Sequence, residues 1–338
     1  MATERELEEL LSRPSAADAG LMGRLDGPLL LLGAGGKMGP TLAMRAKRAA
    51  EQAGVERRVI AVSRYSDAAA REKLEQCGVE TISADLLNRD ELAALPDSAN
   101  VLYLAARKFG SSDSAYLTWG MNAWLPGIVA ERYRHARIVA MSSGNIYPLV
   151  PVAGGGATEE TPLAPVGEYG QSVLARERIF EYFSHLYGTR VVSVRLNYAV
   201  ELRYGVLVDI GTAVFERKPI DLTMGNVNVI WQGDANSVIL RSLELAATPP
   251  AVLNLTGPET ISVRGIARQF ARHFGVEPEF TGQPADTALL NNASRCHALF
   301  GNPTVTPGEL IEWTAQWIGM GGASLGKATK FSVRDGKF

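Results

Sequence analysis

Three glycines at regular spacing near the N-terminus are the residues that most plainly indicate chemistry. Gly33, Gly36 and Gly39 lie between four leucines (29–32) and a helix-forming segment (40–50). We expect Gly33 to make a tight turn, Gly36 to admit a phosphate against the backbone, and Gly39 to allow close helix–strand contact. The start of a helix offers unpaired N–H groups and a positive end. The spacing therefore predicts a dinucleotide pyrophosphate site; the alternative is a glycine-rich loop that only turns the chain.

The end of the next predicted strand, 58–64, bears on the type of cofactor. Sites for NAD place an Asp or Glu at this point to bind the ribose hydroxyls, whereas this chain has Ser63 and Arg64. A carboxylate would repel a 2′-phosphate, while Ser and Arg can bond to it. The pair favours NADP over NAD. The alternative is that Arg64 is a solvated surface residue and NAD binds without a carboxylate.

Further polar and small residues end the later strands, predicted at 79–86, 101–106 and 137–143. Asp85 is expected either to accept a hydrogen bond from an adenine amino group or to cap the helix of 89–92. Ligands bind at the carboxyl ends of parallel strands. The residues expected to converge there are Gly33, Arg64, Asp85, Ala106, Lys108 and Ser143.

The elements that position these residues alternate between buried strands and helices. This alternation predicts an α/β fold, a doubly wound parallel sheet, with a smaller C-terminal substrate region. We expect a helical arm over 1–27, a nucleotide-binding domain over 28–196 with a further strand near 252–257, and a substrate region with the C-terminal tail over 197–338. Thr3 and Glu6 predict a capping box in the arm. Residues 151–167, rich in Gly and Pro, predict a mobile loop over the site.

Composition excludes several classes of function. The chain has 338 residues, a net charge of −2 and 46% hydrophobic residues, so it has no basic field for nucleic acid or an anionic membrane. No signal peptide or membrane span is expected. Two distant cysteines suggest free thiols in the cytoplasm, and four scattered histidines suggest no metal site.

Several motifs in order carry a family resemblance. The glycine turn, Asp85, Ala105-Ala106, Ser142-Ser143 with Tyr147, the loop 159–162 and Tyr169 resemble the extended short-chain dehydrogenase/reductases, and within them the NAD(P)-dependent epimerase/dehydratase branch. The resemblance covers about residues 28–260. It implies a Rossmann domain, a homodimer formed through two long helices, and a small-molecule substrate. It also implies a Ser143 that orients the substrate and a Tyr169 that moves the proton.

One position departs from the family pattern, which is Tyr-x-x-x-Lys. The fourth residue after Tyr169 is Val173. The family's lysine bonds the nicotinamide ribose, and its charge makes the tyrosine a better base near pH 7. Lys108 is one replacement; alternatively it is a solvated loop lysine or a phosphate contact.

Together these observations predict an NADP- or NAD-dependent epimerase, dehydratase or oxidoreductase that acts on a sugar, sugar nucleotide or polyol derivative. The other hypothesis is a cofactor-binding sensor or scaffold with weak or no catalysis, which Val173 favours. The expected catalytic residues are Ser143, Tyr169 and Lys108. The expected substrate contacts are Asn145, Arg195, Arg203 and Trp231, with an ion pair as the alternative for Arg195 and packing for Trp231. The expected cofactor contacts are Gly33, Gly36, Lys37, Met38, Gly39, Ser63, Arg64, Asp85, Leu86, Ala105, Ala106, Lys108, Tyr169 and Asn197.

Overall fold

Strand β1 (Leu29–Leu32) lies inside a seven-stranded sheet whose order is β12-β7-β5-β4-β1-β2-β3. The computed structural model describes residues 3–337. Every neighbouring pair in this sheet is parallel, which confirms the predicted doubly wound α/β fold. The strand order reverses between β1 and β4, which is where such sheets form a ligand crevice. The remaining strands of the sheet are β2 (Val59–Ser63), β3 (Glu80–Ser83), β4 (Asn100–Tyr103), β5 (Arg137–Ser143), β7 (Arg190–Leu196) and β12 (Ala251–Leu255).

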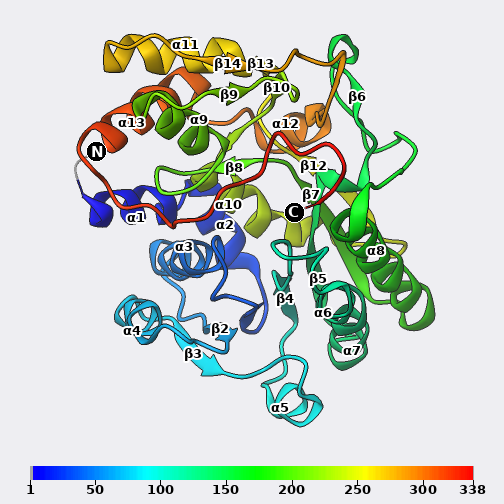
Figure 1. Ribbon diagram of the computed structural model, residues 1–338. Coiled ribbons are helices and arrows are strands. Elements are labelled where there is room, and N and C mark those ends of the chain that lie inside the picture. Colours follow the sequence, from blue (N-terminus) through cyan, green and yellow to red (C-terminus); the bar gives the residue numbers. More distant parts are fainter. Residues whose placement is uncertain (1–2, 338) are drawn as a thin grey trace.

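Helices cover both faces of the sheet, so the four leucines of β1 are all fully buried. Leu29 and Leu31 pack with one set of helices, α2 (Ala16–Arg24), α3 (Gly39–Gln52) and α10 (Gln232–Arg241). Leu30 and Leu32 pack on the other face with α5 (Arg89–Ala94), α7 (Leu125–Arg132) and α8 (Gly167–Tyr187). Figure 1 shows α3 and α8 on opposite sides of the sheet.

A second hydrophobic core lies above the sheet in Figure 1. It is formed mainly by α9 (Val206–Phe215), α11 (Val263–Phe274) and α13 (Pro307–Gly319). Leu7 and Leu11 of α1 (Glu4–Ser12) also enter this core, so the N-terminal arm is part of the C-terminal region's packing.

The capping box of Thr3 and Glu6 is present at the start of α1, as predicted. The sequence analysis did not identify α2, which begins with a second capping box made by Ser15 and Asp18. That box uses Asp at the third helical position, where the pattern usually has Glu or Gln.

The shorter elements connect these layers. They are α4 (Ala68–Gln76), α6 (Ala115–Trp119), the π-helical turn η1 (Gly120–Trp124), the 3₁₀ turns η2 (Gly144–Ile146), η3 (Val152–Gly154) and η4 (Ser242–Leu245), β6 (Val150–Pro151), β8 (Ala199–Val200), β9 (Ile220–Asp221), β10 (Asn226–Val227), β11 (Ile230–Trp231), β13 (Ile261–Ser262), β14 (Phe280–Thr281), β15 (Thr287–Ala288) and α12 (Ser294–Phe300).

Segment 151–167, expected to be a mobile loop over the site, is fastened to a distant part of the chain. The N–H of Val152 donates to the carbonyl of Asp286 at 2.9 Å, and the N–H of Ala157 donates to Leu290 at 2.8 Å. None of its residues lines the two cavities described below. The prediction was wrong because Gly and Pro content signals a break in regular structure, not the absence of partners.

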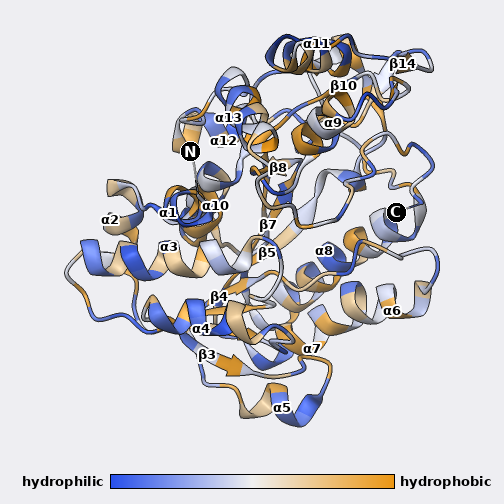
Figure 2. Cartoon of the chain, turned by 60° about the vertical axis from the view of Figure 1, so that its left-hand side comes forward, coloured by the Kyte–Doolittle hydropathy of each residue, from blue (hydrophilic) through white to orange (hydrophobic). Residues whose placement is uncertain are grey.

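Hydropathy follows the layers. In Figure 2 the hydrophobic colour runs along the central strands, and the hydrophilic colour covers the outward turns of α4. In the described range 3–337, no helix is both long enough and apolar enough to cross a bilayer.

Candidate cofactor and substrate sites

The glycine turn after β1 has the geometry that its three glycines predict. Gly33 has φ +86°, and a Cβ there would lie 2.7 Å from the backbone of Ala105. A Cβ at Gly39 would collide with the carbonyl of Ala34, so only glycine permits this close approach. At Gly36, by contrast, the nearest protein atom to an added Cβ is the Gly33 carbonyl oxygen at 3.5 Å. The turn therefore requires Gly33 and Gly39 for its own shape, whereas Gly36 leaves its outer side open.

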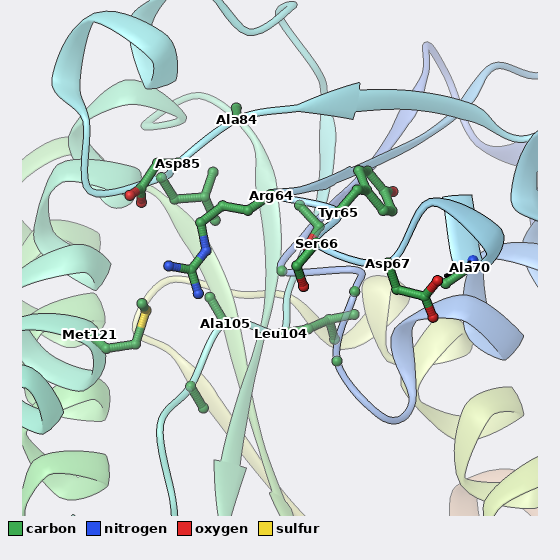
Figure 3. A pocket seen from close by; sticks show the side chains of 16 residues that line it. Arg64, Tyr65, Ser66, Asp67, Ala70, Ala84, Asp85, Leu104, Ala105 and Met121 are labelled. Atoms are coloured by element: carbon green, nitrogen blue, oxygen red, sulfur yellow. Dashed lines mark hydrogen bonds between the residues drawn. The ribbon is translucent and has the colours of Figure 1, made fainter. Parts of the chain in front are cut away.

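That open side faces a cavity of about 310 Å³ along the carboxyl ends of β1, β2 and β4. An open backbone turn, a helix start and a long crevice fit a dinucleotide. Figure 3 shows Arg64 extending from the end of β2 over this cavity, toward Met121 and Ala105. The predicted cofactor residues that line the cavity are Gly33, Gly36, Ser63, Arg64, Asp85, Leu86, Ala105 and Ala106.

Asp85 lies in the cavity wall and does not cap a helix. Its carboxylate accepts the N–H of Leu87 at 3.0 Å, and the cap of α5 is Asn88, which accepts the N–H of Asp90 at 3.0 Å. The capping alternative for Asp85 was wrong, because Asn88 is the residue immediately before the helix. The adenine contact stays a prediction.

A second cavity, of about 170 Å³, lies on the other side of the glycine turn. Its walls come from distant parts of the chain: the glycine turn, the loops after β4, β5 and β7, the starts of α8 and α9, and the C-terminal tail. The lining residues are Lys37, Met38, Lys108, Ser142, Ser143, Asn145, Tyr169, Leu196, Asn197, Tyr198, Ala199, Tyr204, Gly205, Val206 and Thr329. The structure thus brings Ser143, Tyr169 and Lys108 together, and it separates Lys37, Met38, Lys108, Tyr169 and Asn197 from the first cavity.

Buried charges fasten α8 to β5 and so set Tyr169 relative to Ser143. The Arg176 guanidinium donates to the carbonyl of Met141 at 2.7 Å. Ser142 donates to the carboxylate of Glu177 one residue before Ser143. The Ser143 oxygen accepts the N–H of Asn145 at 3.2 Å. These contacts hold both catalytic candidates on rigid elements.

Two lysines line the second cavity. The Lys108 nitrogen lies 5.8 Å from the centre of the Tyr169 ring. The Lys37 nitrogen donates to the carbonyl of Ala199 at 2.7 Å and lies 4.4 Å from the centre of the Tyr204 ring. Both side chains are half-buried, and the loss of hydration lowers the pKa of each to about 8.

Three of the four expected substrate contacts lie outside this cavity. Arg195 forms a buried ion pair with Glu177 at 2.8 Å, which is the alternative considered for it. Arg203 pairs with Glu201 at 3.1 Å and with Glu8 at 3.2 Å, so it anchors α1. Trp231 packs edge-on against Trp313 in the second core. Because these contacts account for all three side chains, we do not assign them to the substrate; Asn145 does line the cavity.

Sequence reasoning missed Gly205, Val206 and Thr329, which line the second cavity. It also missed Asp209 of α9, which does not line the cavity but binds Thr329. Asp209 is the one acid in an apolar helix, VLVDIGTAVF, a signal that could have marked it. Its carboxylate accepts the N–H of Thr329 at 2.8 Å, and burial raises its pKa. Thr329 itself carries no local signal, because its place depends on how a tail without helix or strand crosses the molecule.

Residues 3–337 hold no cluster of three or more His, Cys, Asp or Glu side chains suited to a metal ion. Cys77 and Cys296 are free thiols, and burial raises the pKa of Cys296 to about 12.

Comparison with known proteins gives one match by sequence and many by structure. The family model described as the NAD dependent epimerase/dehydratase family matches residues 29–200. No curated protein matches the chain significantly.

Solved structures share the fold. UDP-glucose 4-epimerase from Thermus thermophilus, in complex with NAD, is 21% identical with a TM-score of 0.71, over 86% of this chain and 98% of that one. The UDP-glucuronic acid 4-epimerase of Bacillus cereus, in complex with NAD, is 18% identical with a TM-score of 0.71, over 86% and 98%. The dTDP-glucose 4,6-dehydratase of Bacillus anthracis str. Ames, also with NAD, is 17% identical with a TM-score of 0.73, over 87% and 96%.

The sheet order, the open glycine turn and the sequence match over half of the chain agree with one another. The chain belongs to the NAD dependent epimerase/dehydratase family.

Proposed function

We propose that this protein is an NAD(P)-dependent epimerase, dehydratase or related oxidoreductase that acts at a carbinol carbon of a sugar, sugar nucleotide or polyol derivative. One observation carries the proposal: Ser143 and Tyr169 line a cavity that adjoins the cofactor cavity across the glycine turn. A carbinol group held there lies beside both a proton donor and the place for a nicotinamide ring.

Each residue has a distinct task in this scheme. The Ser143 hydroxyl bonds the substrate oxygen, and Asn145 fixes that hydroxyl through two donated hydrogen bonds of 3.2 and 3.3 Å. The Tyr169 hydroxyl takes the proton from the carbinol oxygen or returns it. Lys108 brings a positive charge to the same wall, 5.8 Å from the Tyr169 ring centre, in place of the family's lysine. A bound nicotinamide would supply the hydride acceptor and donor.

We propose NADP as the preferred cofactor. The similar solved structures named above hold NAD, so the preference rests on this chain's own residues. Arg64 extends over the cofactor cavity at the end of β2, beside Ser63 and Ser66, and all three offer donors to a phosphate. The carboxylate nearest in sequence, Asp67, also lines the cavity, but it caps α4, where it accepts the N–H of Ala69 at 3.0 Å.

A second candidate is a cofactor-binding sensor or scaffold without strong catalysis. Val173 favours it. This residue is fully buried against Ile146, Tyr147 and Ala157 in an apolar cluster, where a lysine charge would be costly. Residue 173 therefore packs in the apolar cluster and does not supply a charge to Tyr169.

The two candidates differ in whether Tyr169 is needed for turnover. The test measures NADPH or NADH formation and epimer production on a panel of sugars, sugar phosphates and sugar nucleotides, with cofactor affinity measured alongside. We expect Tyr169→Phe to lower kcat about 100-fold or more while cofactor affinity stays the same. Unchanged turnover would disprove the acid/base role. Cofactor binding without turnover of any substrate by the unmodified protein would favour the sensor.

We further propose that residues 28–196 mainly bind the cofactor and that residues 197–338 mainly help to bind the substrate. The cofactor cavity is lined by residues between 33 and 121, whereas the second cavity is also lined by residues from 197–338.

We also propose that the protein forms a homodimer. Between α7 and α8 a groove of about 650 Å³ exposes apolar side chains, including Trp124 and Tyr182 at 54% and 61% exposure. Sedimentation of the protein and its Tyr182→Glu variant tests this, and a dimer unaffected by the change would place the interface elsewhere. Two free thiols support a reducing, cytoplasmic location.

A further inference from the structure

Lys37 lies in the glycine turn but its side chain belongs to the second cavity. The ammonium donates to the Ala199 carbonyl at 2.7 Å and lies over the ring of Tyr204. Neither of these two partners carries a negative charge. A lysine ammonium with neutral partners in a half-buried wall is a binding group for an anion.

Two lysines, Lys37 and Lys108, are among the described residues that line the second cavity, and that lining includes no Asp or Glu. The nearest carboxylate, Glu201, is paired with Arg203 at 3.1 Å. The charges of Asp209 and Lys330 both act on the pKa of Lys108, and the Asp209 carboxylate already accepts hydrogen bonds from Thr329. A substrate with a carboxylate or phosphate would therefore be attracted electrostatically.

The C-terminal tail forms part of the wall of the second cavity and so limits the size of a ligand there. Figure 1 shows the tail leaving α13 and crossing the front of the molecule beneath α9 toward α8. It is held along its length: Leu325 donates to the Arg203 carbonyl at 3.0 Å, Thr329 donates to Asp209, and Arg334 donates to the Thr287 carbonyl at 2.7 Å. Thr329 thereby closes one wall of the cavity.

The volume of the second cavity is small for a nucleotide-linked sugar. The cavity measures about 170 Å³. Sites for drug-sized ligands usually measure roughly 300–1,000 Å³. A single sugar-sized ring with one anionic group is matched to both the volume and the charge.

We propose that the substrate is a small anionic sugar or polyol derivative without a nucleotide, and that Lys37, supported by the charge of Lys108, binds its carboxylate or phosphate. This rests on the proposed function, since the cavity is taken as the substrate site. It assigns Lys37 to substrate specificity, where its position in the sequence suggested a cofactor contact.

The test is calorimetric titration of the NADPH-loaded, full-length protein with four probes: glucuronate, glucose 6-phosphate, glucose and UDP-glucose. We expect at least one of the two small anions to bind tenfold or more tightly than glucose and UDP-glucose. We expect Lys37→Met to weaken that binding about tenfold to hundredfold, the range for a lost charge-assisted hydrogen bond. Lys218→Met is the matched control, because Lys218 is exposed and pairs with Glu216 on the surface.

Several results would overturn the inference. These are glucose or UDP-glucose binding as tightly as the anions, no probe binding below about 10 mM, no effect of Lys37→Met, or an equal loss of NADPH affinity in Lys37→Met. The last result would return Lys37 to the cofactor site. If the unmodified protein binds neither NADPH nor NADH, the proposed function itself fails, and that outcome is seen before any probe is added.

Discussion

Gly36→Ala separates cofactor binding from folding more sharply than any other change in the glycine turn. The added methyl group would lie no closer than 3.5 Å to any protein atom, and the residue has no positive φ. We therefore expect the midpoint of thermal unfolding without cofactor to stay within about 2 °C of the unmodified protein. The methyl group would, however, stand on the open side of the turn, where a phosphate has to meet the backbone.

The expected loss of affinity follows from the contact removed. A hydrogen bond from a backbone N–H to a charged phosphate contributes about 1.5–3 kcal/mol. Losing one such bond raises the cofactor Kd about tenfold to more than hundredfold. Fluorescence titration with NADPH measures this change. Gly308→Ala is the matched control, because a Cβ there lies 4.0 Å from its nearest neighbour and the residue is remote from both cavities.

Gly33→Ala should differ from Gly36→Ala because it destabilises the fold itself. Its φ of +86° and the 2.7 Å approach to Ala105 predict a lower unfolding temperature even without cofactor. If Gly36→Ala binds NADPH as tightly as the unmodified protein, the glycine turn does not hold the diphosphate and the reasoning for the whole cofactor cavity is wrong.

Three further predictions concern charged groups. Arg64→Ala should weaken NADP about tenfold or more and leave NAD binding unchanged, and an equal effect on both cofactors in parallel titrations would remove the 2′-phosphate role. Since burial lowers the pKa of Lys37 and Lys108 to about 8, small-anion binding should be full below pH 7 and decline as the pH rises through 8; calorimetry that shows constant affinity up to pH 10 would contradict this. Arg195→Met should cost about 3–5 kcal/mol in urea unfolding, because it leaves the Glu177 carboxylate buried without its ion pair; a loss below about 1 kcal/mol with abolished substrate binding would restore the substrate role of Arg195.

The sequence by itself determined the fold class and the position of the glycine turn in the candidate cofactor site. The four leucines of 29–32 could only be a strand buried on both faces, and the glycines after them had to turn the chain at a helix start. These features are local, because each depends on residues within one strand–turn–helix unit. For the same reason Ser63, Arg64, Ala105 and Ala106 were found at the ends of their strands.

Only the tertiary structure decided which side of the glycine turn each residue faces. Lys37 and Met38 directly follow Gly36 in the sequence, yet they line the other cavity, and no local pattern shows where along the turn the chain passes from one cavity to the other. Likewise, Arg195 and Arg203 have the charge expected of substrate contacts, but distant carboxylates, Glu177 and Glu8, pair with them.

The C-terminal tail shows most clearly what the local sequence could not predict. Thr329 lines the second cavity and is held there by Asp209, a residue 120 positions earlier, and nothing near Thr329 in the sequence marks it. Burial, pairing and cavity volume depend on contacts between distant segments. Local sequence patterns determine which elements form, whereas those long-range contacts determine what the site can hold.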